Sequence, residues 1–102
     1  MNNISQLKVW EEAIELSVEV YRATSSFPKQ EIFGLTSQIR RSAISISSNI
    51  AEGAGRNSKN EFYHFLGIAN GSSQELKTQL IISDRLQLID KKGSRFFAIQ
   101  NK

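Results

Sequence analysis

The 102-residue sequence contains no cysteine, one proline and one histidine. Without cysteine there is neither a disulfide framework nor a thiolate metal site, which suits a reducing compartment. A single histidine offers no ligand set for zinc or iron, so we predict no metal and no cofactor. No apolar run approaches the length of a membrane span, and the N-terminus lacks a basic region followed by an apolar one. We therefore expect a cytoplasmic protein with no membrane-bound segment.

Acidic and basic residues are unevenly distributed, although the net charge is only +3. Residues 1–31 hold three lysines and arginines against five acidic residues, whereas residues 32–102 hold ten against five. A basic second part permits binding to a polyanion such as nucleic acid, but so mild an excess does not identify one.

The clearest helical pattern lies between residues 34 and 57. Its apolar residues step by four, four, three and four, which places them on one face of a helix: Leu35, Ile39, Ala43, Ile46 and Ile50. The opposite face is polar and mostly short-chained, so a neighbouring helix or a ligand can approach its backbone closely. The segment Gly53-Ala54-Gly55 is predicted to end this helix, because glycine accepts the left-handed conformation.

The whole chain is predicted to be one all-α domain, residues 1–102, because no strand alternation or internal repeat is present. The expected helices span approximately residues 5–25, 34–53, 58–86 and 91–101. Pro28 separates the first two, and Ser58 with Glu61 forms a capping box before the third. Short loops between long helices indicate an up-down antiparallel four-helix bundle with a short fourth helix.

Two features of this bundle need a packing explanation. The first helix has an apolar arc of roughly 200°, which indicates contacts on two sides, either within the bundle or with another subunit. In the third helix, Gly67 and Gly71 each cost about 1 kcal/mol relative to alanine, so a close helix contact or a bend is expected there. The fourth helix is too short to cover the whole groove between the other three. We therefore expect part of that groove to be covered by another copy of the chain or to stay exposed.

Four ordered motifs stand out along the chain: Leu7-Lys8-Val9-Trp10, Gly34-Leu35-Thr36-Ser37-Gln38-Ile39-Arg40-Arg41, Ser48-Asn49-Ile50-Ala51-Glu52-Gly53 and Glu75-Leu76-Lys77-Thr78-Gln79-Leu80. Together they resemble the four-helix bundle protein family, whose members include proteins encoded by intervening sequences in bacterial 23S ribosomal RNA genes. The resemblance implies an up-down four-helix bundle that assembles as a homopentamer. It also implies a relation to the accessory protein of diversity-generating retroelements, which binds nucleic acid and a reverse transcriptase. Ser47 stands where the family commonly has proline, and the segment after Asp90 is shorter than the usual fourth helix.

No group of residues forms a convincing catalytic site. The carboxylates of the first helix share one solvated face, and the serines of the second lack a general base. The glycines at 53 and 55 lack the strand and the Lys-Ser/Thr of a phosphate-binding loop. A helical ribonuclease built on Arg56 and His64 is a distant third hypothesis, since a new helix begins at Ser58 between them. We predict that the protein is not an enzyme.

Four cations are the candidate nucleic-acid-binding residues: Arg40, Arg41, Arg56 and Lys59. Arg41 lies on the polar face of its helix, where it can pair with an acid or contact phosphate. Arg40 projects beside apolar groups, so it needs a carboxylate partner, in the same chain or across a subunit boundary, or a head group that reaches the surface. The alternative role for these cations is an ion-pair network that holds helices together.

The sequence therefore predicts a non-enzymatic, oligomeric helical protein that binds structured RNA, such as 23S ribosomal RNA, or another nucleic acid, mainly through phosphates. The alternative is a protein-interaction scaffold for a nucleic-acid-processing enzyme. Cations that cluster and point outward favour nucleic acid, whereas cations paired with Glu52, Glu61 and Glu75 favour the scaffold.

Overall fold

A computed structural model describes residues 3–89 of the chain. It contains three α-helices, α1 (Ile4–Thr24), α2 (Leu35–Ala54) and α3 (Lys59–Arg85), and a short 3-10 helix, η1 (Lys29–Glu31), between α1 and α2. The three long helices predicted from the sequence are confirmed to within one residue at each end, whereas η1 was not predicted. The predicted fourth helix, residues 91–101, lies outside the described residues. Over residues 3–89 the fold is all-α with three helices, and a four-helix bundle is not established.

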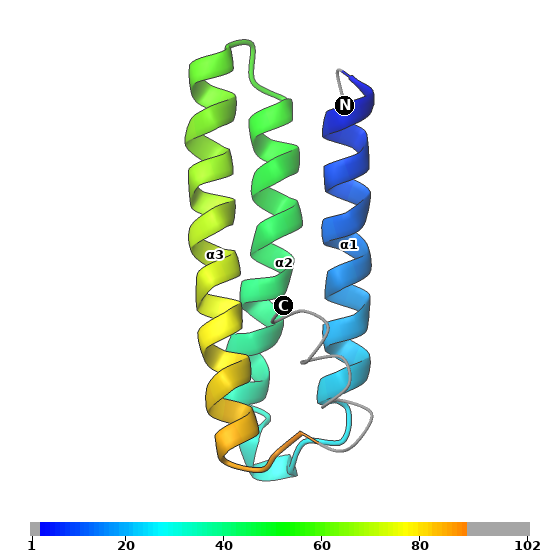
Figure 1. The fold of residues 1–102 in the computed structure, drawn as a ribbon, viewed down its shortest axis with the longest axis vertical. Helices are drawn as coiled ribbons and strands as arrows, with labels where there is room; N and C mark the ends of the chain where they lie inside the picture. Colours follow the sequence, from blue (N-terminus) through cyan, green and yellow to red (C-terminus); the bar gives the residue numbers. More distant parts are fainter. Residues whose placement is uncertain (1–2, 90–102) are drawn as a thin grey trace.

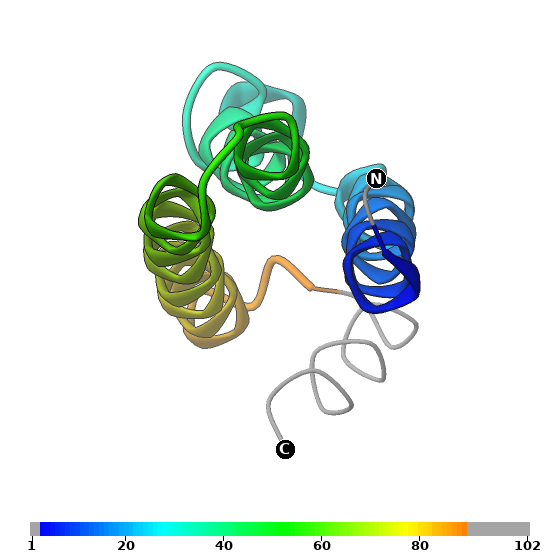
Figure 2. The same ribbon diagram turned by 90° about the horizontal axis from the view of Figure 1, so that it is seen from above.

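The three helices run down, up and down in Figure 1, so that neighbours are antiparallel, and α2 lies in the middle. α2 packs against both α1 and α3, whereas α1 and α3 make almost no direct contact within residues 3–89. Viewed along the helices, α1 and α3 stand apart on either side of α2 (Figure 2). At the lower end in Figure 1 the chain crosses from α3 toward α1, and the half-buried Leu88 and Ile89 pack against the core.

Local hydrogen bonds set the helix ends. Asn3 Oδ1 accepts from the Gln6 amide at 2.8 Å to begin α1, and Ser58 Oγ accepts from the Glu61 amide at 3.1 Å to begin α3, as predicted for that serine. The prediction that a glycine in the left-handed conformation ends α2 is wrong. No described glycine has a positive φ, and Gly55 has φ −80°. The helix simply continues through Gly53 to Ala54.

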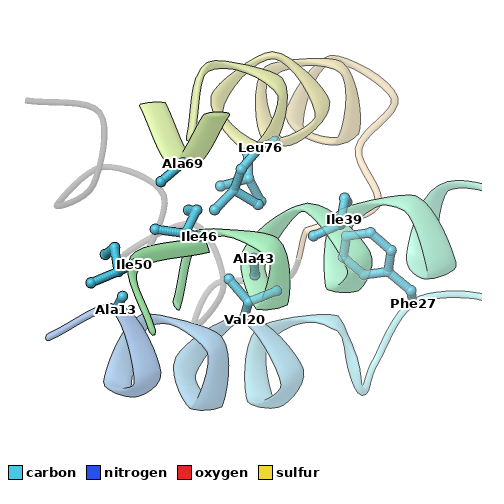
Figure 3. Close-up of a cluster of buried hydrophobic side chains, with 10 residues drawn as sticks. Ala13, Val20, Phe27, Ile39, Ala43, Ile46, Ile50, Ala69 and Leu76 are labelled. Carbon is cyan, nitrogen blue, oxygen red and sulfur yellow. The ribbon is translucent and has the colours of Figure 1, made fainter. Parts of the chain in front are cut away.

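The core lies along α2, whose apolar stripe is buried as predicted (Figure 3). Ile39 and Ala43 are fully buried between the side chains of the two flanking helices. The other buried members of the core are Ala13 and Val20 from α1, Phe27 from the first loop, Ile46 and Ile50 from α2, and Ala69, Leu76 and Leu80 from α3.

The short polar face of α2 allows α3 to come close, as the sequence indicated. The hydroxyl oxygens of Ser45 on α2 and Ser72 on α3 form a hydrogen bond of 2.8 Å. Gly53 is buried against α3, and a Cβ atom placed on it would lie 2.8 Å from Phe65 Cβ. Gly53 is therefore required for close helix packing and not for a left-handed turn.

Gly67 and Gly71 have no such role within the described part of the chain. A Cβ atom at either position would meet no atom within 4 Å, so the expected close contact is not found. Replacing either glycine by alanine in a monomer is therefore expected to raise the free energy of unfolding by about 1 kcal/mol, through helix propensity alone. Urea denaturation of the two single variants measures this. A loss of stability would show that these positions are covered in the folded protein.

Candidate nucleic-acid interface

Arg40 is tied to the end of α1. Its Nε donates to Thr24 Oγ1 at 2.9 Å, one of its terminal nitrogens donates to the Tyr21 carbonyl oxygen at 3.4 Å, and its guanidinium lies 4.5 Å from the centre of the Tyr21 ring. Among residues 3–89 it has no carboxylate partner. Two hydrogen bonds and a cation–π contact, and not an ion pair within the described residues, thus satisfy this half-buried arginine. Arg40 joins α2 to the end of α1, and its guanidinium is held against that helix.

Arg41, the next residue, is exposed on the other side of α2. It lines a polar groove between α2 and α3 that we call the α2–α3 groove: Gln38, Arg41, Ser42, Ser45, Ser72, Glu75 and Gln79. Glu75 lies in the same groove, yet no ion pair joins its carboxylate to Arg41. The Arg41 guanidinium is available to an anion.

Arg56 and Lys59 flank the turn between α2 and α3. Together with Asn57, Ser58 and Phe62 they line a shallow recess there, which we call the turn recess. An Arg56 terminal nitrogen lies 2.6 Å from Glu52 Oε1, and its guanidinium lies 5.1 Å from the centre of the Phe65 ring. Lys59 is exposed, is the first residue of α3, and forms no ion pair within the described residues.

The four candidate cations do not form one patch. Arg40 faces α1 and Arg41 faces α3, and about 20 Å of helix separates Arg41 from the end of α2 at Ala54. The turn recess holds the other two cations beyond that end. One chain therefore presents two separate basic positions, one at Arg41 and one at the turn recess.

Charge on the described part of the molecule is segregated but balanced. Residues 3–89 carry nine lysines and arginines and nine acidic residues. Four of the acidic residues lie on α1 against two cations, while residues 35–85 carry six cations against four acids. The excess of +3 belongs to residues 90–102, which lie outside the described range. Within the described body the cations therefore outnumber the acidic residues only over α2, α3 and the turn between them, by six to four.

An apolar groove runs along the outer side of α1 and α2. Ile14, Val18 and Tyr21 on α1 and Ile44 on α2 are each between 37% and 42% exposed there, with Ser17 and Ser47 at its base. We call this the α1–α2 groove. The wide apolar arc of α1 predicted contacts on two sides, and within residues 3–89 only the side toward the core is covered.

Other kinds of site are not found in the part of the chain that the structure describes. Residues 3–89 contain no cluster of three or more histidine, cysteine or acidic side chains that could hold a metal ion. None of their helices is long and apolar enough to cross a membrane. His64 is exposed and lies edge-on to Phe65, with 5.3 Å between the ring centres.

The sequence did not reveal two of these features. The contact of Arg40 with Tyr21 and Thr24 depends on how the loop through Pro28 turns α1 back onto α2, and no local pattern encodes that register. The polar lining of the α2–α3 groove could have been suspected from the amides and hydroxyls at positions 38, 42, 45 and 79, which share the polar faces of two helices predicted to be adjacent.

Comparison with known proteins bears out the resemblance to a family. A family model described as 23S rRNA-intervening sequence protein matches residues 5–99 of the chain. No curated protein matches. The relation to the retroelement accessory protein is supported by no match.

Proposed function

Because the chain belongs to the 23S rRNA-intervening sequence protein family, we propose that it is a non-enzymatic, self-associating protein that binds structured RNA, with 23S ribosomal RNA as the first candidate. The family name links its members to intervening sequences of that RNA. The observation that carries the proposal is the exposed Arg41 of the α2–α3 groove, which forms no ion pair among residues 3–89, together with the cations of the turn recess.

Contacts of this kind recognise phosphate more than base sequence. Arg41 and Lys59 are exposed cations, and the first amides of α3 beside Lys59 lie at the positive end of a 27-residue helix. The described residues form three long helices, with α1 and α3 packed on either side of α2, and no base-reading module is recognised among them. We therefore expect salt-dependent binding with little sequence preference.

The ion pair of Arg56 with Glu52 does not oppose this proposal. Both side chains are about half exposed, at 45% and 53%, and exposed pairs of this type contribute roughly 0–1 kcal/mol. A phosphate group can compete for the guanidinium at that cost. Arg40 is different, since moving it would break its contacts with α1.

Self-association supports weak phosphate binding in two ways. The exposed α1–α2 groove offers an apolar surface for a second copy of the chain, and several copies act together on one RNA at high effective concentration. The homopentamer implied by the family resemblance is the specific form that we propose.

The test is binding to a structured 23S ribosomal RNA fragment, compared with a DNA duplex of equal length, for the variants Arg41→Ala, Arg56→Ala and Lys59→Ala. Each lost phosphate contact is expected to weaken binding to both nucleic acids several-fold, because RNA and DNA both have a phosphate backbone and a phosphate contact does not depend on base sequence. Lys8→Ala, on the acidic α1 helix, is the matched control and should bind as the unaltered protein does.

The alternative is a scaffold for a nucleic-acid-processing enzyme. It is favoured by the pairing of Arg56 with Glu52, which was the expected sign of a structural role for that arginine. Equal binding of all four variants and the unaltered protein would support the scaffold and contradict RNA binding through these cations.

A further inference from the structure

An exposed tyrosine follows the turn recess on α3. Tyr63 is 63% exposed, although it lies in the second turn of a helix whose other side packs on α2. The centre of its ring lies 6.2 Å from that of Phe62, and the two ring planes are tilted by 43°. Phe62 therefore does not lie flat on either face of the Tyr63 ring, and much of this residue is open to solvent.

A cation stands one helical turn before this tyrosine. Lys59 precedes Tyr63 by four residues, a spacing that makes the two side chains neighbours on the surface of a helix. Lys59 is exposed and forms no ion pair among residues 3–89. It also lines the turn recess together with Arg56. The open ring is thus adjacent to the positions where we expect phosphate to bind.

One helical turn after the tyrosine stands a glycine. Side chains in a helix lean toward its N-terminus, so a side chain at position 67 would cover the surface beside Tyr63. Position 67 is Gly67, and a Cβ atom placed there would meet no atom within 4 Å. The side of Tyr63 away from Lys59 is therefore free of a covering side chain, which gives a reason for a glycine that the helix itself disfavours.

We propose that Tyr63 stacks on an unpaired base of the bound RNA, while Lys59 and Arg56 contact the phosphates beside that base. Unpaired bases stack on aromatic side chains, and cations close by hold the backbone. The inference rests on the proposed binding of RNA and adds a preference for loops and single-stranded segments over duplex, whose bases are stacked on one another. Because every base has a flat face, this contact agrees with binding that has little sequence preference.

The test measures the affinity of the full chain for two fluorescent RNAs with the same number of nucleotides, a hairpin with an unpaired loop and a fully paired duplex. The unaltered protein is expected to bind the hairpin about tenfold more tightly. Tyr63→Leu, which keeps an apolar side chain but loses the ring, should remove this preference by weakening hairpin binding only. Tyr63→Phe keeps the ring and should retain the preference.

Gly67→Leu tests the open space beside the ring without changing Tyr63. Because nothing lies within 4 Å of the new Cβ atom, the variant should melt no lower than the unaltered protein. The leucine side chain should cover the approach to Tyr63 and reduce the preference for the hairpin. A preference that stays the same in this folded variant would contradict stacking on that side of the ring.

Phe33→Leu is the matched control for loss of an exposed aromatic ring. Phe33 is 96% exposed and precedes α2, and the starts of α2 and α3 lie at opposite ends of the molecule (Figure 1). This variant should keep the preference for the hairpin.

Equal affinity of the unaltered protein for the two RNAs, or a preference that survives Tyr63→Leu, would overturn the inference and leave RNA binding intact. Sedimentation velocity of Tyr63→Leu supplies a further check, since the variant should sediment as the unaltered protein does. Separation of subunits by this substitution would assign Tyr63 to a contact between copies of the chain and would also overturn the inference. Failure to bind either RNA would overturn both this inference and the proposed function.

Discussion

Replacing Gly53 by alanine is expected to lower the free energy of unfolding by up to about 2 kcal/mol. The new Cβ atom would lie 2.8 Å from Phe65 Cβ, 3.2 Å from Phe62 Cδ1 and 3.3 Å from the Phe62 carbonyl oxygen. Two of these atoms belong to or adjoin the α3 backbone, so the helices must move apart. Overpacking of this kind costs about 1–3 kcal/mol, against a gain of about 1 kcal/mol in helix propensity. Thermal denaturation should show the melting temperature falling by several degrees.

Gly55→Ala is the matched control two residues further on. Its Cβ atom would meet only carbonyl oxygens at 3.6 Å, an ordinary contact, and φ at this position is −80°. Alanine at this position should leave the free energy of unfolding unchanged or raise it by about 0.4–1 kcal/mol, because alanine lowers the conformational entropy of the unfolded chain. Equal effects of the two substitutions would contradict the close approach of α2 and α3 at Gly53.

Replacing Val18 by aspartate is expected to separate the subunits of the proposed assembly. Val18 is only half-exposed in one chain and lies in the α1–α2 groove, so the folded subunit can place a carboxylate there in water. Burial of that carboxylate against a second copy is costly, at about 3–5 kcal/mol for an unpaired charge, so the dissociation constant should rise at least about 100-fold. Sedimentation velocity over a range of concentrations measures the change.

Asn70→Asp is the control for added negative charge, since Asn70 is exposed on α3 and the substitution changes little else. It should leave the assembly intact. A Val18→Asp protein that sediments as the unaltered protein does would place any subunit contact elsewhere than the α1–α2 groove.

The positions of the helices were predictable because the signals that mark them lie within a few residues of one another in the sequence. The apolar stripe of α2 and the Ser58 cap of α3 depend on residues three or four apart, and both are confirmed. The end of α2 shows the limit of such rules. A glycine near a helix end usually indicates a left-handed turn, yet Gly53 is explained by Phe65, twelve residues away on another helix.

The candidate site was less predictable, because it depends on which faces of the helices meet. The sequence grouped Arg40 with Arg41, but neighbours in a helix point about 100° apart, and here one contacts α1 while the other lines the α2–α3 groove. The charge balance of residues 32–102 likewise overstated the basic character of the described body, which is neutral over residues 3–89. Closeness in the sequence therefore identified exposed cations, but it did not show that they lie at two separate places, one at Arg41 and one at the turn recess.

The most direct test of the central proposal is the salt dependence of binding between the full chain and a structured 23S ribosomal RNA fragment. If Arg41, Arg56 and Lys59 each neutralise one phosphate, log affinity should fall with log salt at a slope of about −2 to −3, a loss of at least about 20-fold between about 50 and about 200 mM salt. Affinity that does not change with salt, or an absence of binding by folded protein at low salt, would contradict RNA binding through phosphates and favour the protein-interaction scaffold.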